Sequence, residues 1–359
     1  MVTINIRKEN NMDYIVMDLE WNQNPYGKDV IHSDISFEII EIGAVRVNEN
    51  LEIEDRYQQV IRPRIFRKLH YKIKEITQFT IEELNAGKDF RRAIREFLEW
   101  CGDDYIFCTW GSMDLVELQK NMKHYGYERI LDFPLFYVDL QKMFSLRYDD
   151  GHIKRTLSHA VEFLNIEENI PFHRALSDAY YTARVMQTMD FEKYKNRLSI
   201  DTFYYPRIKE EEVFVRFDTY TKFISRELLS KEEMFAEPEI RDQKCNICDK
   251  PLDIELDWFS DAGKMYYCLG SCPEHGYVKG KIKVKKIDDD SFFAIKIMKS
   301  TDEDGAKSIY DKQEAIREKR RERRNKMLDQ EIVIDELWDL EENESPDELS
   351  PIENSEDDV

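Results

Sequence analysis

One short apolar stretch near the N-terminus limits the fold of this chain more than any other. Residues 14–20, Tyr-Ile-Val-Met-Asp-Leu-Glu, read as a buried strand that carries two carboxylates at its C-terminal end. Successive side chains of a strand alternate faces, so Asp18 and Glu20 point to one side and Leu19 to the other. Two acids held this close repel each other unless a cation lies between them. Hard oxygen ligands of this kind suit Mg²⁺ or Mn²⁺.

The length and the charge distribution set the broad class of protein. A chain of 359 residues has room for about two domains, each with its own core. The formal net charge is −21, but the charges are unevenly placed. Residues 307–326 contain nine Lys or Arg against four Asp or Glu, whereas residues 328–359 contain fourteen acids and no Lys or Arg. This asymmetry predicts a basic helix followed by a disordered acidic tail, and it does not exclude nucleic acid as a partner.

The N-terminal residues contain no apolar segment of the signal-peptide type, and no apolar run is long enough to cross a bilayer. We therefore expect a cytoplasmic protein that has no membrane partner. In that compartment the six cysteines are reduced, so closely spaced cysteines are better explained as metal ligands than as disulfides. Cys101 and Cys108 are expected to be inert core thiols.

Hydrophobic periodicity predicts an α/β domain over residues 1–198. The first three strands are expected to form an antiparallel meander with the first strand at its edge, and two later strands alternate with helices. The expected fold is a mixed five-stranded sheet with helices on both faces. The expected strands are 14–20, 37–47, 53–61, 105–110 and 135–139, and the expected helices are 90–100, 113–125, 156–164 and 175–189.

The character of the sequence changes after residue 198. We expect a connecting segment at 199–237 with one helix at 221–229, and then a small zinc-ribbon-like β domain at 238–300. A basic helix at 301–328 and an acidic tail at 329–359 complete the predicted organisation.

Two later clusters complete the set of carboxylates. Asp114 follows a strand and a Trp-Gly turn, and it falls in the first turn of an expected helix. His173 and Asp178 open another expected helix, five residues apart. Each acid alone has an ordinary explanation, because acids are favoured at helix N-termini. Together, in this order and at the ends of these elements, they indicate a catalytic site.

The order of these blocks resembles the DnaQ-like exonuclease family, in its DEDDh branch, which has an RNase H-like fold. Three blocks match in order, within about the first 190 residues: Asp18-Leu19-Glu20 with Glu41-Ile42-Gly43-Ala44 behind it, Asp114 after the Trp-Gly turn, and His173-x-Ala175-x-x-Asp178-Ala179. The resemblance implies a 3′–5′ exonuclease that releases nucleoside monophosphates from the 3′ end of a single strand. Two divalent ions about 4 Å apart activate water and stabilise the leaving oxygen in such an enzyme.

This chemistry gives each residue an expected role. Asp18 would bridge two Mg²⁺ or Mn²⁺ ions, Glu20 and Asp178 would hold the ion that carries the attacking water, and Asp114 would hold the second ion. His173 would accept the proton, because the ordinary pKa of histidine, near 6.5, leaves the ring neutral at physiological pH.

The residue after the acidic pair departs from the family pattern. Many members carry small residues there, whereas Trp21 follows in this chain; its ring either stacks on the terminal base or covers the core. Leu19, Ile76 and Phe79 are weaker candidates for contacts with the substrate. The variation is closer to the histone-mRNA and small-RNA exonuclease subgroup than to proofreading subunits, which favours RNA.

Two other functions remain open. A DNA exonuclease of the repair or proofreading type would carry the same motifs, because contacts with a 2′-hydroxyl cannot be read from them. A non-catalytic regulatory interaction protein would use the fold as a scaffold, although a scaffold does not need five such side chains together. A protein or ribosome partner is expected at the ribbon, the basic helix or the acidic tail.

A cysteine cluster lies in the second half of the chain. The spacing Cys245-x-x-Cys248, followed by Cys268 and Cys272, fits a closed tetrahedral site for one structural Zn²⁺. These four cysteines are the expected ligands, and His275 is the alternative for one of them.

Aromatic and basic residues are interleaved beside this cluster. Tyr266 and Tyr267 lie close in sequence to a ladder of lysines at 279–286. Stacking and phosphate attraction would suit single-stranded nucleic acid, and an ordinary solvated strand face is the equal alternative.

Overall fold

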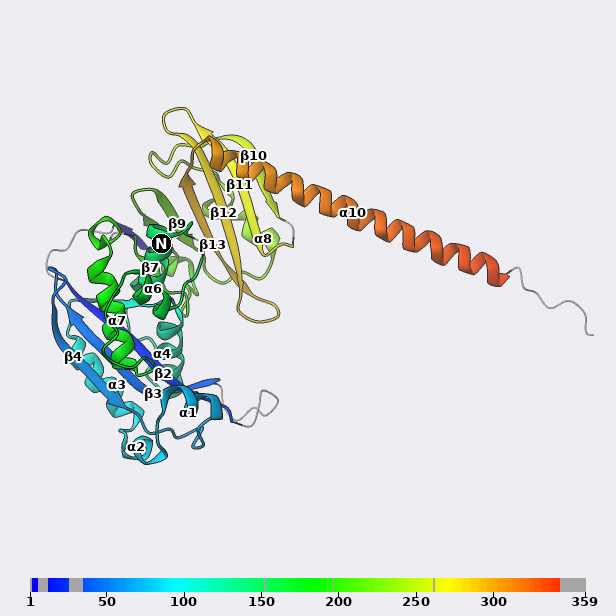
Figure 1. The fold of residues 1–359 in the computed structure, drawn as a ribbon. Helices are drawn as coiled ribbons and strands as arrows, with labels where there is room; N and C mark the ends of the chain where they lie inside the picture. The colour runs from blue at the N-terminus through cyan, green and yellow to red at the C-terminus, as the bar shows by residue number, and fades with distance from the viewer. Residues whose placement is uncertain are drawn as a thin grey trace, which may run out of the picture. The chain divides into compact units, whose positions relative to one another are not determined.

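The computed structural model describes residues 2–5, 12–25, 35–151, 153–195, 197–260 and 262–342, and the side chains only between 12 and 326 (Figure 1). Contacts divide the chain into two compact units. Unit 1 comprises residues 1–217 and 222–228, and unit 2 comprises residues 218–221 and 229–359. The expected boundary at residue 198 lies inside unit 1, because residues 199–217 contribute further strands to it.

A six-stranded mixed sheet forms the centre of unit 1, in the order β4-β3-β2-β5-β6-β7. Strand β2 is antiparallel to β3 on one side and parallel to β5 on the other. The predicted mixed sheet of the RNase H-like type is confirmed, with a short sixth strand added. The first predicted strand lies inside the sheet and not at its edge, because β5 pairs with its second side. The strands are β2 (Asp13–Gln23), β3 (Phe37–Val47), β4 (Ile53–Val60), β5 (Tyr105–Thr109), β6 (Phe136–Asp139) and β7 (Ser199–Ile200).

Helices cover both faces of this sheet. Helices α5, α6 and α7 share a buried core with Val16 of β2, whereas α3 and α4 share another with Ile15 and Met17. Because strand side chains alternate faces, Asp18 and Glu20 lie on the same face as Val16, toward α7. The helices of unit 1 are α1 (Tyr71–Thr77), α2 (Ile81–Ala86), α3 (Phe90–Cys101), α4 (Met113–His124), α5 (Leu140–Tyr148), α6 (Leu157–Phe163) and α7 (Ala175–Thr188).

Several helices begin at residues that satisfy the free N–H groups of the first turn. Helix α2 begins with a capping box: Thr80 Oγ1 accepts from the Glu83 N–H at 3.1 Å, and Glu83 Oε2 accepts from the Thr80 N–H at 2.9 Å. Asp139 caps α5 and Thr156 caps α6 in the same way, through a hydrogen bond to a backbone N–H three residues on.

The remaining elements of unit 1 lie outside this six-stranded sheet. Strand β1 (Val2–Asn5) pairs in parallel with β8 (Val213–Arg216), and two 3₁₀ helices, η1 (Phe191–Lys193) and η2 (Lys209–Glu211), lie in the connections. The expected helix at 221–229 is wrong, because this region contains strand β9 (Tyr220–Ile224). Its side chains are alternately buried and half-buried over the first four residues, which is the period of a strand.

Unit 2 contains a meander of four antiparallel strands. They are β10 (Asp253–Ser260), β11 (Met265–Cys272), β12 (Gly276–Lys286) and β13 (Phe292–Ser300), preceded by α8 (Lys231–Ala236) and α9 (Pro238–Arg241). The long helix α10 (Glu303–Glu342) packs its first turns, through Ala306 and Ile309, against Leu269 of β11.

Helix α10 contains the basic segment that the sequence predicts to be helical, and it continues past residue 328 into the expected acidic tail. The rest of that tail, residues 343–359, lies outside the described residues. Among the described helices, none combines the length and the apolar character needed to span a bilayer.

Candidate active site

Strand β2 carries the first two acids of the site. Asp18 lies opposite Gly43 of β3, and Glu20 lies opposite Glu41. The pairing register shifts directly after Glu20, so the regular alternation is interrupted where the acidic pair ends. The two carboxylates therefore share one face of the sheet at the point where β2 changes its pairing.

Gly43 allows the N-terminus of helix α7 to approach this pair. A Cβ atom added to Gly43 would lie only 2.0 Å from the Leu176 nitrogen and 2.1 Å from the Ala175 carbonyl carbon. No side chain fits in that space, so the backbone of α7 rests directly on β3. This close approach brings Asp178, in the first turn of α7, to the acids of β2.

His173 precedes α7 and completes this side of the site. The ligand atoms of Glu20, His173 and Asp178 all lie within 4.8 Å of one another. The backbone at His173 has a left-handed φ of 66°, which non-glycine residues adopt rarely. The His173 N–H donates to Asp178 Oδ2 at 3.2 Å and to Oδ1 at 3.3 Å, and this interaction holds the turn in place. The imidazole side chain itself is exposed.

Asp114 reaches the same site from helix α4. Its Oδ1 accepts a hydrogen bond from the Leu19 N–H at 3.2 Å, between the two acids of β2. The residue is buried at 6% exposure, in the first turn of α4. The sequence-predicted acids from three separate elements, β2, α4 and α7, are thus brought to one place.

Burial is the main reason that the pKa of each of these acids is raised, and mutual repulsion adds to it. The pKa of Asp18 is raised well above its ordinary value, by burial and then by Asp114, Asp178 and Glu20. Burial raises the pKa of Glu20 to about 8, although Arg174 lowers it in part. Burial likewise raises the pKa of Asp114 to about 7 and that of Asp178 to about 6, against backbone hydrogen bonds that lower both. This cluster of four acids is therefore stabilised by bound protons or by an added cation.

The sequence matches Glu41 to the family pattern, but it did not predict that Glu41 pairs with Arg174 and holds α7 in position. Glu41 is fully buried, and its carboxylate accepts from Arg174 Nη2 at 2.9 Å, from the Ala175 N–H at 2.9 Å and from Gln58 Nε2 at 2.8 Å. The signal was present, because Glu41 is an acid inside the apolar run of residues 37–47, and a buried acid needs partners.

Two of the expected substrate contacts are not available as side chains. Leu19 is 3% exposed and packs into the core under the sheet, so only its backbone faces the site. Phe79 is 1% exposed in a cluster with Ile40, and the Arg174 guanidinium lies 4.2 Å from its ring centre. Both predictions are corrected for the same reason: an apolar side chain already covered by packing offers no surface to a base.

The other two candidates differ from each other. Trp21 packs against the core under the sheet, with its ring centre 5.7 Å from that of Phe37, which favours the core-covering alternative. Ile76 on α1 is 45% exposed and remains a candidate for a substrate contact.

The cysteine prediction differs from the structure at one position. Cys245, Cys248 and Cys272 come together with His275, whereas Cys268 is not part of this group. Cys268 lies four residues before Cys272 on strand β11, which corresponds to a separation of about 13 Å along an extended chain. One ion cannot bind both.

Four acids from three elements, buried or half-buried beside an exposed histidine, define a site suited to metal-assisted hydrolysis of phosphate esters. Residues 15–186 match the family model described as Exonuclease, the RNase T type. The chain therefore carries an exonuclease domain of this family, formed by most of unit 1, and the resemblance seen in the sequence is confirmed.

Three curated relatives show the range of this family. A DNA polymerase III of PolC type from Clostridium perfringens is 28% identical over 201 residues, covering 55% of this chain and 13% of the polymerase. A DNA polymerase III subunit epsilon from Aquifex aeolicus is 29% identical over 181 residues, covering 50% and 81%. The 3′–5′ exoribonuclease 1 of Rattus norvegicus is 24% identical over 163 residues, covering 42% and 46%. The chain thus spans less than half of two of these relatives, and the family match ends before unit 2.

Proposed function

We propose that this protein is a 3′–5′ exonuclease that removes nucleoside monophosphates from the 3′ end of single-stranded RNA, using two Mg²⁺ or Mn²⁺ ions. The observation that carries the proposal is the convergence of Asp18, Glu20, Asp114 and Asp178 beside His173, within a domain of the exonuclease family.

The donor set suits such ions. All four ligands are carboxylates, which divalent hard cations prefer, and the raised pKa values come from burial and from repulsion that an added cation relieves. Asp18 would hold the ions together with Glu20, Asp114 and Asp178, each of which adds to its raised pKa. When bound, divalent ions lower the pKa of water and neutralise the charge that develops at phosphorus.

The chain supplies the remaining parts of the reaction. His173 is exposed next to Glu20 and Asp178, where its imidazole accepts the proton of the attacking water. The Leu19 N–H fixes one oxygen of Asp114, so this carboxylate keeps its orientation when substrate arrives. The Glu41–Arg174 pair holds the backbone of α7, and therefore Asp178, in register with β2.

Unit 2 has a surface that suits the phosphates and bases of a single-stranded nucleic acid. Lys281 and Lys283 on β12 pair in register with Tyr267 and Met265 of β11, and Lys312 of α10 places its amine 4.6 Å from the Tyr267 ring centre. Burial, and then the neighbouring charges of Lys283 and Lys312, lower the pKa of Lys281. Exposed amines around an aromatic ring attract phosphates and stack a base. We refer to Tyr267, Lys281, Lys283 and Lys312 as the lysine face.

RNA is the preferred substrate class in this proposal. The relatives include both an exoribonuclease and DNA polymerase components, so the family alone does not decide between them. The bulky Trp21 after the acidic pair favours the RNA-degrading subgroup.

The test compares RNA and DNA single strands of the same sequence, labelled at the 5′ end, with Mn²⁺. We expect a ladder that shortens from the 3′ end one nucleotide at a time, with faster shortening of RNA. Equal or faster shortening of DNA would overturn the RNA assignment. Cleavage within the strand, or shortening from the 5′ end, would overturn the 3′–5′ exonuclease assignment.

A further inference from the structure

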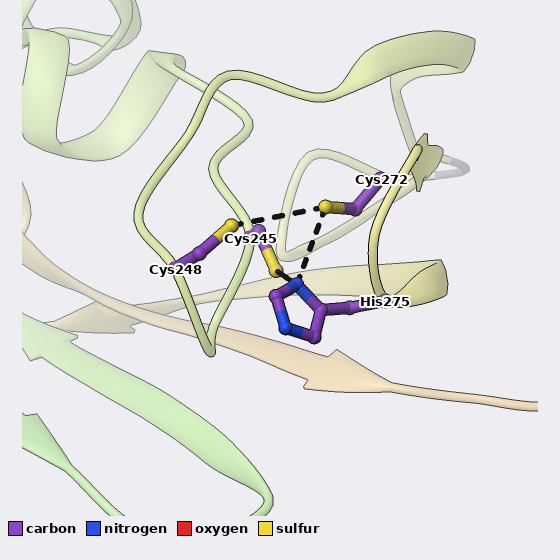
Figure 2. Close-up of side chains that lie close together, drawn as sticks. All are labelled: Cys245, Cys248, Cys272 and His275. Atoms are coloured by element: carbon purple, nitrogen blue, oxygen red, sulfur yellow. Dashed lines mark hydrogen bonds between the residues drawn. The ribbon is translucent and has the colours of Figure 1, made fainter.

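A second group of metal-ligating side chains lies in unit 2. Cys245 and Cys248 belong to the loop before β10, whereas Cys272 ends β11 and His275 precedes β12 (Figure 2). Both pairs have a two-residue spacing, and each forms a tight turn: the Asp249 N–H donates to the Cys245 carbonyl at 3.0 Å, and the His275 N–H donates to the Cys272 carbonyl at 3.2 Å. Two similar turns therefore face each other.

The distances between the ligand atoms match the edges of a tetrahedron. His275 Nδ1 lies 3.6 Å from Cys245 Sγ and 3.5 Å from Cys272 Sγ, and the sulfurs of Cys248 and Cys272 are 3.8 Å apart. All four ligand atoms lie within 4.8 Å of one another. Around a zinc ion with Zn–S near 2.3 Å and Zn–N near 2.0–2.1 Å, tetrahedral corners are about 3.8 Å apart for two sulfurs and about 3.5 Å apart for sulfur and nitrogen.

Neither a disulfide nor a chance meeting of thiols accounts for this cluster. A sulfur–sulfur distance of 3.8 Å is far longer than the ~2.05 Å of a disulfide, and all six cysteines are free. Cys245 and Cys272 are buried. Polar ligand atoms that cluster in a buried place need a binding partner, and a metal ion would provide it. The Ile247 N–H points to Cys245 Sγ at 3.4 Å, an arrangement that stabilises a thiolate.

Cys268 has a different environment. It lies opposite Gly280 of β12 and is fully buried, and a Cβ on Gly280 would lie 2.3 Å from its sulfur. Burial raises the pKa of the Cys268 thiol, so it is a packed, protonated core group.

We propose that Cys245, Cys248, Cys272 and His275 bind one Zn²⁺ in a closed structural site. The ion links the loop before β10 to the turn between β11 and β12, a connection that the Lys250–Glu274 ion pair spans on the surface. Four protein ligands leave no open position, so this zinc stabilises unit 2 and takes no part in hydrolysis.

The zinc content of the full-length protein, measured by mass spectrometry of the metals after an EDTA wash, tests the site. We expect one zinc per chain in the wild type, in Cys268→Ser and in Asp18→Asn, and loss of zinc in Cys245→Ser and His275→Ala. A wild type without zinc would overturn the proposal. Loss of zinc in Cys268→Ser with retention in His275→Ala would overturn the ligand set.

Because removing a ligand can unfold unit 2, His275→Cys provides a second measurement. This variant should retain one metal per chain and, with Co²⁺ in place of zinc, show a stronger thiolate-to-cobalt charge-transfer absorption than the wild type. An absorption equal to that of the wild type would show that residue 275 is not a ligand, and it would contradict the proposal.

Discussion

The guanidinium of Arg174 donates hydrogen bonds to both oxygens of the Glu41 carboxylate, across 133 positions of sequence. Glu41 also accepts from the Ala175 N–H, the first residue of α7. A single buried carboxylate therefore fixes where α7 begins relative to β3. Because Asp178 lies in the first turn of α7, this pair positions one of the acids of the active site.

Replacement of Glu41 by Ala should destabilise the protein and reduce its activity. It removes the partner of the Ala175 N–H and leaves the half-exposed Arg174 with a longer contact to Glu83 at 3.9 Å, so we expect a loss of about 1–3 kcal/mol. Urea unfolding of the variant should give this loss in the free energy of unfolding. Exposed Glu99→Ala on α3 is the matched control and should change it by less than about 0.5 kcal/mol. A Glu41 variant as stable as the control would show that the pair does not hold α7.

Gly43→Ala tests the contact between β3 and α7. The new methyl group would lie 2.0 Å from the Leu176 nitrogen, so the helix must move away and carry Asp178 with it. We expect a loss of about 1–3 kcal/mol in unfolding free energy and a large fall in nuclease rate at temperatures where the variant is folded.

Gly102→Ala separates this steric effect from backbone strain. Gly102 has a φ of 79° and a ψ of −158°, a conformation that only glycine adopts readily, and nothing lies within 4 Å of an added Cβ. Ala there should cost about 1–3 kcal/mol through backbone strain alone and should leave the rate per folded molecule unchanged. A Gly43 variant with a normal rate would contradict the role of this contact.

The carboxylates predict how stability depends on pH and metal. Burial raises the pKa of Glu20 from its ordinary value of 4.5 to about 8, so the metal-free folded state holds a proton that the unfolded state releases between these values. Stability from this group is complete below about pH 4.5 and is lost as pH rises toward 8. Asp114 and Asp178 act in the same direction, up to about pH 7 and about pH 6.

Thermal unfolding in EDTA should therefore show a melting temperature that falls from pH 5 to pH 8. At one fixed concentration, about a hundred times its Kd at pH 8, Mn²⁺ should restore about 2.7 kcal/mol per independent site at pH 8. The gain at the same concentration should be smaller at pH 5.5, where protons compete for the carboxylates. Asp18→Asn should lose most of this metal effect. A gain from Mn²⁺ that is equal at both pH values would contradict the protonation of the metal-free site.

The lysine face predicts how RNA affinity depends on salt. Lys281→Glu combined with Lys283→Glu should weaken binding of a long single strand and reduce the slope of log affinity against log salt, by about 0.7 for each phosphate that the variant no longer binds. Lys286→Glu is the control, since Lys286 points to the opposite side of β12 and pairs with Asp289 at 2.5 Å. Equal slopes for the double variant and the wild type would show that this face does not bind the strand.

Much of unit 1 was predictable from sequence, because the determinants are local. Apolar patterning identified β2 and β3, and the Thr80-x-x-Glu83 spacing is that of the capping box at the start of α2. The position of β2 inside the sheet was not predictable in this way, since it depends on a parallel pairing with β5, more than 80 residues away. The segment now seen as β9 contains Thr-Lys-Phe-Ile, which fits a strand as well as a helix over so few residues.

In the candidate site, too, the residues in local motifs were predictable and those that act through long-range contacts were not. The four acids and the histidine were visible as motifs, but Glu41 and Arg174 act through a contact between distant segments. The burial of Phe79 likewise depends on Ile40, Leu69 and Leu84, which meet only in the folded chain. His275 was within reach of sequence, because Cys272-x-x-His275 repeats the two-residue spacing of the first cysteine pair.

The most direct measurement is the single-turnover rate of mononucleotide release from 3′-labelled RNA with Mn²⁺, compared between Asp18→Asn and Asp13→Asn. Both changes remove one negative charge from β2 with little change of shape, but Asp13 pairs with Arg46 at 3.0 Å, away from the other acids. We predict that Asp18→Asn lowers the rate by about a thousandfold, and that Asp13→Asn leaves it unchanged. A wild-type rate in Asp18→Asn, or release that persists in EDTA, would contradict a metal-dependent exonuclease at this site.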